Sequence, residues 1–168
     1  MKRLSGFSII ELLIIISMVT ALVIVAAPSF YGIFKQQFLI YNSSQLIQNI
    51  RSLQSNAFIE NNSYKIGFNS NENSYTIWKY NNASWQLEED YTFDDSVTID
   101  YGTLLSDSYH LVYSNNGQAY LCNNVQTPNE CNTPLSTKAS LTLKTSKKDI
   151  MIEFLPINGY VSSNIGVK

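Results

Sequence analysis

The sequence predicts an α+β fold in which a long N-terminal helix, half membrane-spanning and half amphipathic, packs against an antiparallel β-sheet domain. Three patterns lead to this prediction. Residues 12–34 form one uncharged apolar run. Apolar residues then recur at helical spacing to about residue 60, and beyond it the pattern changes to alternation interrupted by turn residues. A chain of 168 residues, 45% of them hydrophobic, suits one membrane helix and one globular domain.

The apolar run is long enough to cross a bilayer. Leu12 to Phe34 exceeds the about 20 residues that a membrane helix requires. Lys2 and Arg3 precede it, so the positive-inside rule places the N-terminus in the cytoplasm and the domain from residue 36 outside. Glu11 stands at the head of the run. A charge deep in a membrane helix costs roughly 2.5–3.5 kcal/mol, so this acid needs a partner or a role.

These residues carry a family resemblance. A short basic leader ends at Gly6, Phe7 follows, and Glu11 is the fifth residue after the glycine. The apolar residues that come next contain Pro28. This arrangement resembles the N-terminus of the type IV pilin and type II secretion pseudopilin superfamily.

The resemblance implies a pilin-like fold with three parts. Residues 1–6 are a leader, residues 7–35 form the transmembrane and polymerisation helix, and residues 36–168 form the globular domain. A prepilin peptidase and methylase cleaves between Gly6 and Phe7 and methylates the new N-terminus. The processed subunit resides in the bacterial inner membrane, with its domain periplasmic or extracellular, and then enters a pilus or pseudopilus. Its partners are other subunits and the inner-membrane assembly platform. Neither an enzymatic activity nor a cofactor is implied.

Physical chemistry agrees with such processing. Cleavage would remove Lys2 and Arg3 and create an α-amine at Phe7, one helical turn from Glu11. In a filament of packed helices, the acid of one subunit would pair with the amine of another in a medium of low dielectric constant. Gly6 suits close approach by a protease because it has no side chain.

Two other origins for the apolar run remain open. Val25-Ala26-Ala27 resembles the small-residue cleavage site of a secretory signal, although the apolar region of a signal spans only about 7–15 residues. A plain single-pass anchor would keep an accidental acid. The mature protein would begin at Phe7 in a pilin, at Pro28 after signal cleavage and at Met1 in a plain anchor.

The second part of the helix is amphipathic. Its apolar positions recur at spacings of three, four or seven residues, and they are Leu39, Leu46, Ile50, Leu53 and Ala57. A continuous helix from Ser8 to about Ile59 would be roughly 75–80 Å long, with a bend or loosening at Pro28. Asn61-Asn62 is the expected stop.

Short strands are expected after the helix. The alternating segments are Tyr64–Phe68, Tyr75–Ile77, Val97–Ile99, Leu111–Tyr113, Leu141–Leu143 and Ile150–Leu155. The turn segments are Asn69–Asn73, Asn81-Asn82, Asn115–Gly117, Ser146–Asp149 and Pro156–Gly159. An antiparallel sheet over the helix would bury the apolar stripe.

The tail resembles the minor pseudopilin and minor pilin branch called GspH or FimT. Three segments carry this likeness: Arg51–Ala57, Tyr113–Gly117 and Ile152–Gly159. Some members of the branch bind DNA through a basic G-R-x-R stretch, but Gly159-Tyr160-Val161-Ser162 contains no arginine. The basic cluster of Lys144, Lys147 and Lys148 is expected to be a solvated hairpin turn, and the formal net charge of −2 argues against broad phosphate binding. DNA uptake, or binding of a surface ligand at a filament tip, is the alternative function.

The remaining candidates are two cysteines and an acidic segment. Cys122 and Cys131 are expected to form a disulfide in a turn-rich loop on the oxidising side of the membrane. A metal site there would need further ligands, and His110 is expected to be a half-buried structural residue of a strand.

The acidic segment contains no lysine or arginine, and its members are Glu88, Glu89, Asp90, Asp94, Asp95, Asp100 and Asp107. A solvated loop or a charged subunit contact is expected. Asp90, Asp94 and Asp95 would be the residues to test for calcium. The abundant tyrosines and the two tryptophans are expected to pack across strands, and no sequence motif of an active site is present.

Overall fold

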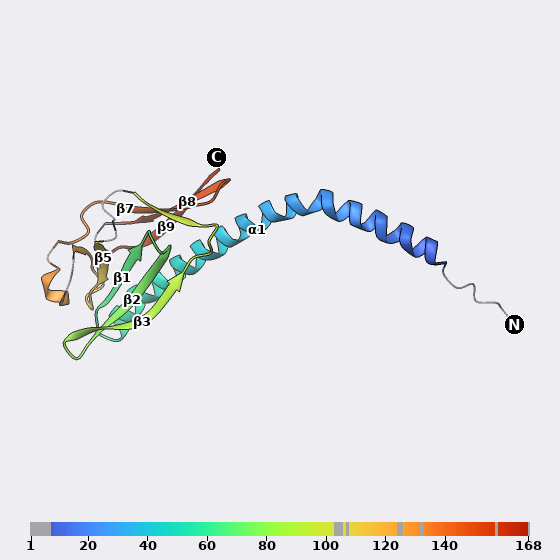
Figure 1. The fold of residues 1–168 in the computed structure, drawn as a ribbon. Coiled ribbons are helices and arrows are strands. Elements are labelled where there is room, and N and C mark those ends of the chain that lie inside the picture. The colour runs from blue at the N-terminus through green and yellow to red at the C-terminus, as the bar shows by residue number, and fades with distance from the viewer. Residues whose placement is uncertain are drawn as a thin grey trace. The chain divides into compact units, whose positions relative to one another are not determined.

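The computed structural model describes residues 8–102, 106, 108–123, 126–131, 133–156 and 158–167, with the side chains of Ser29 and Val167 excepted. The fold is α+β, as predicted, with one long helix and antiparallel sheets (Figure 1). Two compact units divide at Lys35 and Gln36. Helix α1, Ile9–Ile59, contributes its first part to one unit and its second part to the other, and it continues through Pro28.

The second part of α1 buries the predicted stripe. Leu39, Leu46, Ile50, Leu53 and Ala57 are each at most 4% exposed. The helix also ends where the asparagines predict. Asn61 adopts a positive φ of 51°, and the Asn62 N–H donates to the Ala57 carbonyl at 3.1 Å, a typical capping arrangement at a helix C-terminus.

The described strands form two antiparallel sheets. One has five strands in the order β3-β2-β1-β5-β6, and the other has four in the order β4-β7-β8-β9. The strands of the first are β1 Tyr64–Asn69, β2 Ser74–Asn81, β3 Ser84–Thr92, β5 Tyr109–Tyr113 and β6 Ala119–Asn123. The strands of the second are β4 Thr98–Tyr101, β7 Ala139–Lys144, β8 Lys148–Phe154 and β9 Val161–Val167, and the 3-10 helix η1 is Pro128–Glu130.

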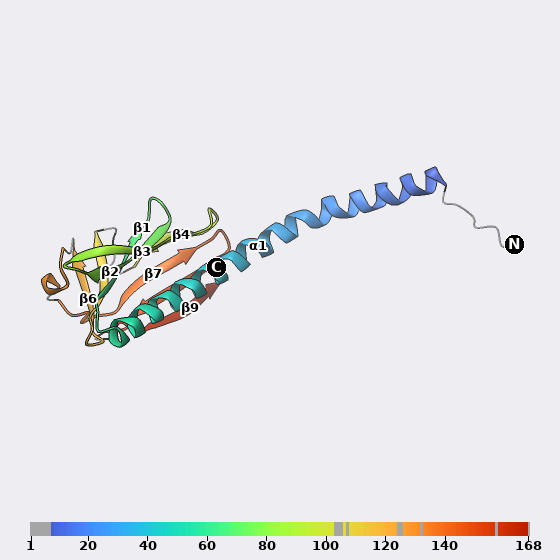
Figure 2. The same cartoon turned by 90° about the horizontal axis from the view of Figure 1, so that it is seen from below.

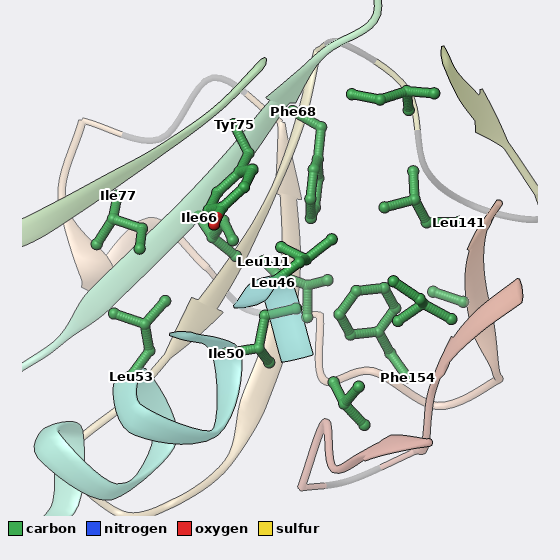
Figure 3. Close-up of a cluster of buried hydrophobic side chains, with 14 of the residues drawn as sticks. Leu46, Ile50, Leu53, Ile66, Phe68, Tyr75, Ile77, Leu111, Leu141 and Phe154 are labelled. Atoms are coloured by element: carbon green, nitrogen blue, oxygen red, sulfur yellow. The ribbon is translucent and has the colours of Figure 1, made fainter. Parts of the chain in front are cut away.

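Both sheets share one core with α1. Figure 3 shows Leu46, Ile50 and Leu53 of the helix among side chains of the five-stranded sheet, such as Ile66, with Phe154 of the four-stranded sheet beside them. Polar contacts add to this packing and attach the helix to each sheet.

These polar contacts come from three side chains of α1. The Asn49 amide donates to the Tyr75 hydroxyl at 2.9 Å, in the five-stranded sheet. At the other sheet, Arg51 donates to the Val161 carbonyl at 3.4 Å and Gln54 to the Asn158 carbonyl at 3.0 Å, where β9 lies beside the helix (Figure 2). The helix is therefore attached to both sheets.

The sequence missed β3, β6 and β9, and all three are edge strands. The expected solvated loop was wrong for Glu88, Glu89 and Asp90, which lie in β3, and for Asp100, which lies in β4. Asp94 and Asp95 do lie in an exposed loop between these strands. An edge strand pairs on one side only, and most side chains of β3 face solvent, so no apolar alternation marks it. Cys122 was likewise expected in a loop and lies in β6 instead.

A buried contact links the two sheets. The Tyr113 hydroxyl of β5 donates to the carbonyl of Gly159, in the turn between β8 and β9, at 3.0 Å. Gly159 has a φ of +63°, and a Cβ there would lie 2.5 Å from the Ala119 Cβ and 2.9 Å from the Tyr113 ring. Glycine is therefore required for both backbone conformation and space. Tyr113 and Gly159 belong to two of the segments that carried the GspH/FimT likeness.

We predict that Gly159→Ala lowers the free energy of unfolding by about 3 kcal/mol, because it adds steric overlap to positive-φ strain. Gly117→Ala is the matched control. Gly117 also has a positive φ, +78°, but a Cβ there meets nothing within 4 Å, so about 1 kcal/mol is expected. Urea unfolding of the purified chain, followed by tryptophan fluorescence, measures both. Equal losses would show that the close approach to Ala119 costs nothing.

Candidate functional site

The first part of α1 is exposed all round. Ile9–Pro28 has a mean hydropathy of 2.9 over its most apolar window, and none of that window is buried. It is the one described helix whose length and composition suit a membrane span. Ile9, Leu22 and Val25, for example, are 80%, 71% and 79% exposed. Apolar surface of this extent requires a cover, which a bilayer or neighbouring helices would supply.

Hydroxyl groups in this segment are satisfied within the helix. Ser17 donates to the Ile14 carbonyl at 2.8 Å, and Thr20 donates to the Ile16 carbonyl at 2.7 Å. A hydroxyl bonded to its own helix presents no unpaired donor to an apolar medium. The segment therefore suits a surrounding that contains no water.

Glu11 lies in the first turn of α1 and is exposed. Its carboxylate makes no hydrogen bond or ion pair with the described part of the chain. The helix N-terminus carries a partial positive charge, which favours an anion in the first turn. Gly6 and Phe7 lie outside the described residues, so cleavage and methylation at that bond remain predictions, as does the pairing role of Glu11.

The two cysteines are joined by a disulfide between β6 and the residue that follows η1. The Cys122 and Cys131 side chains are buried with Val112 on the face of the five-stranded sheet opposite the main core, and Trp85 and Tyr120 pack against them. The disulfide therefore fixes η1 and its flanking segment to the sheet.

The acidic residues do not converge. Asp90 accepts from the Thr76 hydroxyl at 2.9 Å, whereas Asp94 accepts from the Ser96 N–H at 2.9 Å and from its hydroxyl at 2.6 Å. Asp95 is exposed, and Asp107 lies outside the described residues. Within the described ranges, no three His, Cys, Asp or Glu side chains form a group suited to a metal ion.

The basic cluster of Lys144, Lys147 and Lys148 lies on the hairpin formed by β7 and β8. Lys144 forms an ion pair with Asp100 of β4, and this hydrogen bond raises the pKa of Lys144. Lys147 is exposed in the turn, and Lys148 begins β8. One of the three charges is thus already engaged within the domain.

The sequence missed a cluster of aromatic side chains around Lys65 on β1. The ammonium of Lys65 lies 4.7 Å from the ring centroid of Trp78 and 4.8 Å from that of Trp85, which is cation–π distance. Burial lowers the pKa of Lys65. His110 meets Trp78 edge-on with ring centroids 5.5 Å apart. The alternating sequence pattern predicted β1 and β2 as strands. It did not predict their pairing register, which places Lys65 opposite Trp78.

His110 is half-buried in β5, as expected. Gly67 lies directly across the ladder, and a Cβ on it would come within 2.7 Å of the His110 ring. Burial, with a smaller contribution from Lys65, lowers the pKa of His110 to about 4. The imidazole is therefore neutral at physiological pH, consistent with a packing role.

Comparison with solved structures identifies the fold. The minor pseudopilin EpsH from the Type 2 Secretion System of Vibrio cholerae matches with a TM-score of 0.52 and 9% identity, over 76% of this chain and 94% of that one. The type IV minor pilin FimU of Pseudomonas aeruginosa matches with a TM-score of 0.51 and 11% identity, over 79% and 90%. No protein-family model and no curated protein matches the sequence. The chain therefore has the pilin-like fold.

We predict that His110 makes the domain less stable in mild acid. The unfolded chain binds a proton near the ordinary pKa of 6.5, whereas the folded chain binds it near about 4. Stability must then fall as the pH drops from about 6.5 towards 4, by on the order of 2 kcal/mol, and this contribution levels off below that.

Denaturant unfolding at several pH values tests this prediction by comparison with His110→Gln, which cannot titrate. The difference in unfolding free energy between the two proteins should change over this window, while carboxylates common to both cancel. A constant difference from pH 7 to pH 4 would contradict the proposed neutrality of the buried imidazole.

Proposed function

We propose that this protein is a minor pilin or pseudopilin, a membrane-anchored subunit that assembles into a type IV pilus or type II secretion pseudopilus through its N-terminal helix. One observation carries the proposal. A single helix is apolar and exposed all round in its first part, is buried along one stripe in its second part, and has a lone acid in its first turn. The pilin-like fold, matched over 76% and 79% of the chain, supports the same conclusion.

The proposal includes a maturation step and a location. A prepilin peptidase would cleave between Gly6 and Phe7 and methylate the new amine. The subunit would wait in the inner membrane with its N-terminus cytoplasmic and its domain periplasmic. The assembly platform would then extract it as Glu11 pairs with the amine of a neighbouring subunit. Its partners in this process are other subunits, the peptidase and the platform.

We predict that Glu11→Val inserts into the membrane normally but enters filaments or pseudopilus complexes at least about tenfold less, because it removes the anion and not the apolar surface. Membrane fractionation and quantification of the subunit in sheared filaments measure the two steps separately. Glu11→Gln, which keeps the side-chain volume, should fail equally. Glu11→Asp, which keeps the charge, should retain part of the incorporation. Full incorporation of the valine variant would refute the pairing role.

We also predict that the mature protein begins with N-methylated phenylalanine at Phe7. Mass spectrometry of the N-terminal peptide from purified membranes identifies the start directly. A start at Pro28 would indicate a secretory signal, and a start at Met1 would indicate an unprocessed anchor.

A further inference from the structure

A cavity of about 440 Å³ opens where α1 ends beside the five-stranded sheet. Its size falls within the range of small-molecule sites in proteins, about 300–1,000 Å³. Five separate segments contribute to its wall. Among them are the turn after α1 with Asn61 and Asn62, β2 with Tyr80, β6 with Tyr120 and η1 with Asn129. The part of α1 before Lys35 contributes no residue to the cavity wall.

The wall is polar and uncharged. Among the described residues that line the cavity there is no lysine, arginine, aspartate or glutamate. Asn115 donates to the Asn61 side-chain oxygen at 3.0 Å, and this bond orients both amides. The Asn129 amide and the Tyr80 hydroxyl form no hydrogen bond with any other described residue, so they are available to a ligand.

The polar, uncharged wall determines which ligand groups can bind. An asparagine amide both donates and accepts, which matches a hydroxyl group that does the same. A phosphate, carboxylate or ammonium group would lose water on entry and find no opposite charge. The cavity therefore favours neutral ligands rich in hydroxyl groups.

Two aromatic rings complete the wall, and both are held in place. The Tyr80 ring packs edge-on against Trp85 with centroids 5.2 Å apart, and the Tyr120 hydroxyl donates to Gln118 at 2.6 Å. Ring surface beside amide groups suits a sugar, whose C–H faces are apolar and whose edges carry hydroxyls.

The disulfide holds one wall of the cavity in place. Cys131 lines the cavity and follows η1 directly, and its N–H donates to the Pro128 carbonyl at 3.1 Å. Its bond to Cys122 attaches the Asn129 segment to β6. A ligand would thus meet a wall that is already formed, which lowers the entropic cost of binding.

We propose that this cavity binds a neutral, hydroxyl-rich ligand of the saccharide class. The site would give the subunit a recognition role besides assembly, and it does not depend on the filament proposal. Cleavage and incorporation can fail without affecting saccharide binding, and the reverse also holds.

Saturation-transfer NMR on the full chain tests the proposal, in an amine-oxide detergent that has no sugar head group. The neutral probes are glucose, galactose, N-acetylglucosamine and N,N′-diacetylchitobiose, and the charged probes are glucose 6-phosphate and glucuronate. At least one neutral probe should bind saturably, and at least about tenfold more tightly than either charged probe. The absence of saturable binding by every neutral probe would overturn the proposal, as would equal binding of the charged probes.

Two variants locate the binding. Asn129→Ala removes an exposed amide without a described hydrogen-bond partner, so it should weaken binding by about tenfold while the thermal unfolding temperature stays unchanged. Tyr80→Phe keeps the ring and should weaken binding less. Asn71→Ala, in the exposed turn between β1 and β2, is the control and should bind as the unaltered protein does. Unchanged binding by Asn129→Ala, or equal weakening by Asn71→Ala, would place the binding elsewhere and refute the site.

Discussion

The structure depends on one helix that must satisfy two different surroundings. Before Lys35, α1 is apolar on every side, and nothing in the described chain covers it. After Lys35, one apolar stripe of the helix is buried by the sheets. Burial of a leucine or isoleucine side chain contributes roughly 1.5–3 kcal/mol, so Leu46, Ile50 and Leu53 together stabilise the domain considerably. The first part contributes nothing to that core, so its apolar character must serve a surrounding outside the chain.

The two sheets make the second part of the helix indispensable. No ladder joins the five-stranded sheet to the four-stranded one among the described strands. They meet through packing, as where Phe68 approaches Phe154 edge-on at 6.4 Å, and through the hydrogen bond from Tyr113 to Gly159. Each sheet alone would leave its inner face exposed, and α1 closes the space between them. The helix that carries the exposed apolar segment is therefore also the element that holds the domain together.

The sequence was most informative where burial was strongest. Strands with alternating buried residues, such as β1 and β8, were predicted because their apolar period was visible. Edge strands such as β3 and β9 were not, because solvent accepts almost any polar residue there. The candidate sites differ in the same way, because some are visible in one segment of sequence and others are assembled only by the fold. Glu11 became a candidate from the sequence because a charge in an apolar run is anomalous by itself, and its role stays a prediction. The cavity was not found, because its ordinary asparagines and tyrosines come from segments that only the fold brings together.

An ion pair formed by Glu11 would be strong only in a medium without water. Two opposite charges 4 Å apart attract by about 1 kcal/mol in water but by about 4 kcal/mol at an effective dielectric constant of 20. A pair between Glu11 and a processed amine would therefore be weak in solvent and strong among packed apolar helices. A slip of one helical turn, about 5.4 Å, would separate the partners and leave both charges buried alone. The penalty for a wrong register is thus larger than the gain from a correct one. If subunits assemble as proposed, this single acid would set the axial position of a subunit, because the smooth apolar surface around it would have little means of doing so.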